Sequence, residues 1–229
     1  MNKTDEIAGK YEPRENTSEE EIERRFIPIS GAELRAETYG DKPTILGYAA
    51  RFNIWDGEED MFWEKIEPGA FSVSIASDDV RCLFNHESSE LLGRKSNQSL
   101  RLWEDNLGLW MECDINPDDP LAMSTFAKVK RRDVTGQSFS FRTPKDAWEF
   151  EDGETPRRTL VEISLRDVGP VTFPFYEVTS VDIAFRSLTK AREGLKLDND
   201  HGLDKLTHAL RLQEKRRHDM YFKNLKGGK

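Results

Sequence analysis

Apolar and polar residues alternate over short stretches in the middle of the chain, a period typical of half-buried β-strands. Turn residues separate these stretches, for example at Gly40–Pro43 and Asp105–Gly108. We therefore expect a mainly β domain with a few helices over residues 26–188. The pattern predicts strands at 26–29, 33–39, 44–52, 79–86, 91–94, 100–103, 107–115, 133–142, 158–166 and 180–185.

One longer stretch, residues 118–132, has a helical pattern instead. It begins with Asp119 and Pro120, which suit a helix start, and it ends in bases, which suit a helix end. Leu121, Phe126 and Val129 fall near one face. The pattern predicts a helix directly before the strand at 133–142.

The two ends of the chain differ from this middle part. Residues 1–26 hold eight acids and five bases with almost no apolar spacing, so we expect a flexible charged arm over residues 1–25. Residues 190–229 hold eleven Lys or Arg and six Asp or Glu, a net charge of +5, with a narrow leucine stripe. This predicts a basic amphipathic tail over residues 189–229, either binding a partner or lying against its own domain.

Composition excludes several classes of function. A formal net charge of -9 argues against general nucleic-acid binding. No apolar run approaches the roughly 18 residues of a membrane span. Cys82 and Cys113 form neither a disulfide framework nor a zinc motif, and no phosphate-binding or dinucleotide-binding loop is present. We therefore expect no cofactor, no metal, no membrane partner and no nucleic-acid partner.

The strand at 133–142 is the best candidate for chemistry. Phe139 and Phe141 alternate with Ser138 and Ser140, so the hydroxyls share a small polar face opposite the core. A hydroxyl held on a rigid strand beside open space suits a nucleophile. The ordinary alternative is the solvent face of a half-buried strand.

Two further residues stand out against their neighbours. His86 lies at the end of its predicted strand, where it suits a general base or a structural role. Glu162 lies in mid-strand among apolar residues, and a buried charge needs a partner. That partner is either an imidazole or an arginine such as Arg142 or Arg166.

Seven short motifs, in order, resemble the bacteriophage prohead proteases, the serine proteases of capsid maturation, between about residues 45 and 186. The motifs are Gly47–Asn53, Glu64–Phe71, Val80–His86, Leu92–Arg94, Asp105–Leu109, the helix after Pro120, and Gly136–Phe141. The resemblance implies a closed or partly open β-barrel of the herpesvirus assemblin type, with flanking helical tails.

The resemblance also implies a catalytic site. The histidine of the Asn-His motif is His86, and the serine of the Ser-Phe-x-Phe motif is Ser138; Ser140 stands where the family often has glycine. The acidic third member falls on the strand after the nucleophile, where Glu162 matches best. The chain departs from the family afterwards, because residues 164–171 look like an insertion.

The implied function is that of a serine endopeptidase, active inside the immature capsid in the host cytoplasm. Such enzymes cut scaffold or the N-terminal part of the major capsid protein, and then themselves; homo-oligomerisation stays open. Two alternatives remain: a non-catalytic assembly protein on the same barrel, and a lyase that uses His86 and Glu162 without Ser138.

Overall fold

The computed structural model describes residues 9–15, 22–27, 33–58, 62–151, 154–173 and 178–195. Its described strands form one sheet of eight strands and one of four, and three helices accompany them. The prediction of a mainly β fold with a few helices is therefore confirmed. None of the helices in these ranges is long and apolar enough to cross a membrane.

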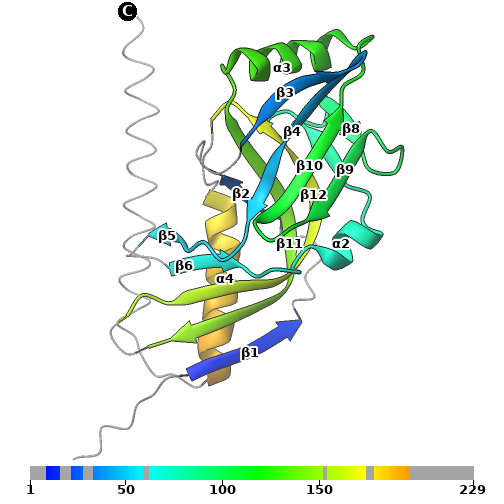
Figure 1. Cartoon of the computed structure of the whole chain (residues 1–229). Helices are drawn as coiled ribbons and strands as arrows, with labels where there is room; N and C mark the ends of the chain where they lie inside the picture. Colours follow the sequence, from blue (N-terminus) through cyan, green and yellow to red (C-terminus); the bar gives the residue numbers. More distant parts are fainter. Residues whose placement is uncertain are drawn as a thin grey trace, which may run out of the picture.

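The larger sheet is organised around a long antiparallel hairpin (Figure 1). Its two strands are β11 (Gly136–Phe150) and β12 (Arg157–Val171). The other strands lie along the two sides of this hairpin. Two strands pair with β11, namely β1 (Gly9–Glu15) and β2 (Glu23–Ile27). Two others pair with β12, namely β6 (Phe62–Ile66) and β7 (Arg81–Leu83). Strand β5 (Asp56–Glu58) then pairs with β6, and β8 (Leu91–Arg94) pairs with β7.

The smaller sheet packs across the hairpin to enclose the core. Its order is β3 (Arg35–Tyr39), β4 (Lys42–Arg51), β10 (Gly108–Asp114) and β9 (Leu100–Glu104). Helix α3 (Pro120–Arg131) lies along β3 and β4, as Figure 1 shows. The remaining helices, α2 (Ser72–Ser77) and α4 (Val178–Leu195), contact the larger sheet.

Helix α3 matches the predicted helix, and its ends explain why it forms there. The Asp119 carboxylate accepts hydrogen bonds from the backbone N–H groups of Leu121 and Ala122, at 2.9 and 3.3 Å. Backbone N–H groups in the first turn of a helix have no partner within the helix, so these two hydrogen bonds satisfy them. Arg132 ends the helix in the left-handed conformation, with φ 71°.

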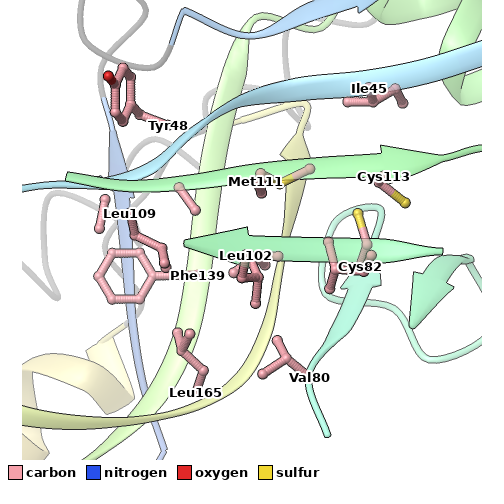
Figure 2. Close-up of a cluster of buried hydrophobic side chains, with 14 of the residues drawn as sticks. Ile45, Tyr48, Val80, Cys82, Leu102, Leu109, Met111, Cys113, Phe139 and Leu165 are labelled. Atoms are coloured by element: carbon pink, nitrogen blue, oxygen red, sulfur yellow. The ribbon is translucent and has the colours of Figure 1, made fainter. Parts of the chain in front are cut away.

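The core fills the space between the sheets with side chains from both (Figure 2). Cys82 and Cys113 are buried there as free thiols. A hydrogen bond to Cys113, together with burial, raises the pKa of the Cys82 thiol well above its usual value. Gly93 is required beside them, because a Cβ at that position would lie 2.5 Å from Cys113 Sγ.

Several predictions about architecture need correction. The described strands do not close into a barrel, because β3 and β9 each end the smaller sheet with one paired side. The relationship to the assemblins stays a prediction. Within the expected flexible arm at residues 1–25, the described segments 9–15 and 23–25 belong to strands β1 and β2, which pair with β11.

The C-terminal boundary also differs from the prediction. Residues 180–185, predicted as a strand, lie in helix α4, which runs through the expected boundary at 188. Ala184, Leu188 and Ala191 are buried at spacings of four and three residues, the period of a helix rather than a strand. Residues 196–229 of the predicted tail lie outside the described ranges.

Candidate active site

Strand β11 presents the two candidate hydroxyls as the alternation predicts. Phe139 and Phe141 are buried in the core, with their rings stacked at 4.9 Å. Ser138 and Ser140 lie on the opposite face of the strand, opposite Gly169 and Asp167 of β12. Both serines are themselves buried, so this face is not an ordinary solvent-exposed side of a sheet.

His86 lies in a loop rather than at the end of a strand. Strand β7 ends at Leu83, and both Asn85 and His86 adopt left-handed backbone, with φ of 54° and 60°. Asn85 fastens this loop to the end of β12: its N–H donates to the Pro170 carbonyl at 3.0 Å, and its Oδ1 accepts from the Thr172 N–H at 2.8 Å. These bonds offset the strain of the unusual backbone and hold the imidazole in one place.

The structure brings His86 and Ser138 together. His86 Nε2 lies 2.7 Å from Ser138 Oγ, although 52 positions separate the residues in the chain. The other ring nitrogen, Nδ1, lies 2.5 Å from Oδ1 of Asp167. An imidazole between a hydroxyl and a carboxylate is the arrangement that allows a serine to act as a nucleophile.

Ser140 completes the environment of the Asp167 carboxylate. Its hydroxyl donates to Oδ2, the oxygen that His86 does not contact. The side chain of Asp167 is 4% exposed and that of His86 8% exposed. Because little water reaches the carboxylate, these two donors fix its orientation.

The predicted contact between Glu162 and His86 is not found. Glu162 instead forms an ion pair with Lys145, with Nζ and Oε2 2.8 Å apart, and not with Arg142 or Arg166. The cause is the register of the hairpin, which pairs Glu162 with Lys145. Lys145 is seven residues beyond Ser138, or roughly 23 Å along a strand.

The sequence does not single out Asp167, because residues 164–171 look like an insertion relative to the family. They form the second half of β12, which runs as far as β11 does. Counting outward from the turn would have found the residue: Glu149 pairs with Arg157, so a hairpin with few bulges places residue 166 or 167 opposite Ser140. The structure pairs Ser140 with Asp167.

A network of buried charges joins this hairpin to β2 and β6, next to the residues of the candidate site. Arg158 donates to Glu23, Glu64 and Asp146 at 2.7 to 3.0 Å, and Arg25 donates to Glu23 and Glu64 at 2.6 to 2.9 Å. We call these five residues the ion network. Arg25 also links it to the candidate site, because its carbonyl oxygen accepts from Ser138 Oγ at 2.8 Å.

The chemical groups at the candidate site all come from side chains. No group of three or more His, Cys, Asp or Glu residues in the described part of the chain could hold a metal ion. The donors and acceptors at hand are a hydroxyl, an imidazole and a carboxylate in hydrogen-bond contact. Such a set can move a proton while a serine oxygen forms a bond to a carbonyl carbon.

Comparison with known proteins agrees with this geometry. The model of the family described as Caudovirus prohead serine protease matches residues 30–193. The chain belongs to this family. It is therefore a protease of phage head maturation, and its serine-protease class agrees with the hydroxyl, imidazole and carboxylate described above.

Two individual proteins are similar to this family member. The prohead protease of Enterobacteria phage HK97 is 29% identical over 159 residues, which are 69% of this chain and 67% of that protein. The structure of the bacteriophage T4 capsid assembly protease aligns with a TM-score of 0.42 at 12% identity. That alignment covers 71% of this chain and 99% of the T4 chain.

Proposed function

We propose that the chain is a serine endopeptidase in which Ser138 is the nucleophile, His86 the general base and Asp167 the third member. The observation that supports this assignment is the continuous contact from Ser138 Oγ through both ring nitrogens of His86 to Asp167 Oδ1. Asp167 takes the role expected of Glu162, whose carboxylate is paired with Lys145.

The proposed reaction follows from these contacts. Ser138 Oγ attacks the carbonyl carbon of a peptide while its proton passes to His86 Nε2. The imidazolium then gives this proton to the leaving amine, so the peptide bond breaks and an ester to Ser138 remains. A water molecule cleaves the ester by the same two proton transfers, and Asp167 stabilises the imidazolium in both halves.

Ser140 has a supporting role in this proposal. Its hydroxyl holds Oδ2 of Asp167, so Oδ1 stays directed at the ring N–H of His86. This fixes the tautomer in which Nε2 is free to accept the proton of Ser138. We therefore assign Ser140 as a positioning residue and not as a second nucleophile.

The proposed substrates are proteins of the immature capsid. Family membership supports this class, since the matching model describes prohead proteases and the HK97 relative carries that name. Scaffold segments, the N-terminal part of the major capsid protein and the chain itself are the specific candidates. Cleavage would take place inside the prohead, within the host cytoplasm.

A serine-reactive fluorophosphonate tests the nucleophile. Wild-type protein should be labelled on Ser138, and Ser138→Ala should lose labelling and lower peptide cleavage by about 10⁴-fold or more, with an unchanged melting temperature. Ser140→Ala is the matched control on the same strand and should still be labelled. Labelling at Ser140, or equal cleavage by the wild type and Ser138→Ala, would show that the assignment is wrong.

A further inference from the structure

The candidate nucleophile is covered by the chain's own N-terminal region. Ser138 is only 5% exposed, although a protease nucleophile must reach a peptide carbonyl. Strand β2 runs antiparallel along β11 here, with Phe26 opposite Ser138 and Ile27 opposite Gln137. The described strand therefore lies where an extended substrate would have to lie to reach the hydroxyl.

The contact between β2 and the nucleophile is a direct one. The carbonyl oxygen of Arg25 lies 2.8 Å from Ser138 Oγ, and His86 Nε2 lies 2.7 Å from the same atom. A hydroxyl has one proton and can donate it to one acceptor at a time. When the proton is directed at the Arg25 carbonyl, His86 cannot take it, and Ser138 is not activated.

Strand β2 also lies outside the part of the chain that the family shares. The family model begins at residue 30, whereas β2 ends at Ile27. The three residues of the Ser138–His86–Asp167 contact all lie within the matched range. The shared domain thus contains the site, and β2 is a segment placed over it.

The contacts of the Arg25 side chain indicate which peptide side chain would bind at this edge of β11. Its guanidinium donates to both oxygens of Glu64, from Nε at 2.6 Å and from Nη2 at 2.9 Å, and lies 5.5 Å from the ring of Phe141. Among the ion network residues outside β2, Glu64 and Asp146 face only Arg158. Because Glu23 and Arg25 both belong to β2, the network has a net charge of -1 with or without this strand. Without β2, however, Glu64 loses both hydrogen bonds from Arg25, and a basic side chain of the peptide would replace them.

We propose that the edge of β11 at Gln137–Phe141 is the peptide-binding edge of the protease and that β2 occupies it as an internal inhibitor. The peptide that replaces β2 is extended and carries Arg or Lys where Arg25 now lies, directly before the bond that is cut. This proposal rests on the proposed function of Ser138. Release of β2 then becomes the step that turns the protease on.

A reversible crosslink in the full-length chain tests the inhibition. Residues 27 and 137 are direct cross-strand partners, close enough for a disulfide, and the Gln137 amide has no hydrogen-bond partner among the described residues. The double variant Ile27→Cys, Gln137→Cys should lose fluorophosphonate labelling at least 10-fold when oxidised and recover it after reduction. Each single variant, treated in the same way, is the control and should not change.

Two peptides test the basic preference. They are identical except for Arg or norleucine directly before the cleaved bond, and kcat/KM should favour Arg by at least 10-fold. Glu64→Gln should reduce that ratio towards one. The control Glu67→Gln, at an exposed position directly after β6, should leave it unchanged. The ratio does not depend on how much of the enzyme is open, so any loosening of β2 by Glu64→Gln cannot produce the result.

The outcomes separate the two levels of the proposal. Equal labelling of the oxidised and reduced double variant would overturn inhibition by β2, and a ratio near one in the wild type would overturn the basic pocket. Failure of the proposed function appears elsewhere, as equal cleavage by the wild type and Ser138→Ala.

Discussion

Strands β11 and β12 carry two buried polar clusters of opposite character. The first is the contact of Ser138, His86 and Asp167, supported by Ser140, and the second is the ion network. The first cluster can rearrange by moving one proton along its hydrogen bonds. The second pairs two arginines with three carboxylates, and its charge changes only if one of these residues leaves. The candidate site and the ion network thus lie a few residues apart along the same pair of strands.

The pKa values of two residues in the ion network explain why its charges are stable. Burial alone would raise the pKa of Glu23, but Arg158 and Arg25 outweigh this and lower it to about 2. The pKa of Arg158 is raised well above its usual value, because Glu23, Glu64 and Asp146 outweigh its own burial. Glu23 and Arg158 therefore stay charged in the folded protein near neutral pH.

Asp167→Asn should show the largest difference between the two clusters, because it should lower activity and leave stability almost unchanged. Asparagine keeps the shape but cannot stabilise the imidazolium, so kcat/KM for peptide cleavage should fall about 10⁴-fold with little change in melting temperature. Glu162→Gln is the control, since Glu162 contacts Lys145, and it should cleave at the wild-type rate. A loss of activity in Glu162→Gln that matches Asp167→Asn would return the role to Glu162.

Arg158→Met should affect stability instead of chemistry. It leaves Glu23, Glu64 and Asp146 with fewer cationic partners in a buried site, which should lower the free energy of unfolding by about 3–5 kcal/mol. Urea unfolding measures this, and labelling of Ser138 per folded molecule should not fall.

The neighbouring Arg157 provides the matched control for Arg158. Its side chain is 38% exposed and pairs with Glu151 and Glu154 at the surface. Arg157→Met should therefore cost about 1 kcal/mol or less. Equal losses of unfolding free energy in Arg158→Met and Arg157→Met would mean that burial does not increase the contribution of the ion network to stability.

Ser140→Ala should have a smaller effect on the reactive cluster. It removes the hydrogen bond to Oδ2 of Asp167, and losing a bond to a charged group costs about 1.5–3 kcal/mol, or roughly 10-fold to 100-fold in rate. The loss should appear in kcat with KM unchanged, and Ser140→Thr should restore part of it. A fall in stability without a change in kcat would make Ser140 merely structural.

The smallest expected effect is a change in how steeply the free energy of unfolding falls at acid pH. The pKa of Glu23 is depressed in the folded state, so its stabilisation is present above the unfolded-state value near 4.5 and is lost as pH falls towards 2. Glu23→Gln removes this dependence, and its unfolding free energy should fall less steeply below pH 4.5, by up to about 1.4 kcal/mol per pH unit. Identical slopes in urea titrations from pH 6 to pH 3 would contradict the assigned pKa.

The predictions that succeeded were those that depend on local sequence. Alternation placed Ser138 and Ser140 on one face of a strand and Phe139 on the other. Asp119 and Pro120 marked the start of α3, which Asp119 caps. Such features follow from side-chain period and capping chemistry within a few residues, so a sequence alone reveals them.

The predictions that failed depend on which strands meet. The register of β11 and β12 decided that Asp167, and not Glu162, reaches His86. Part of the expected flexible arm instead pairs with β11 as strand β2, and the Arg25 carbonyl of this strand accepts a hydrogen bond from Ser138 Oγ. By itself the sequence determined the residue types, the strand that carries Ser138 and the family resemblance. Only the tertiary structure decided which carboxylate reaches His86 and which strand covers Ser138, because long-range pairing and burial of charge arise between segments far apart in the chain.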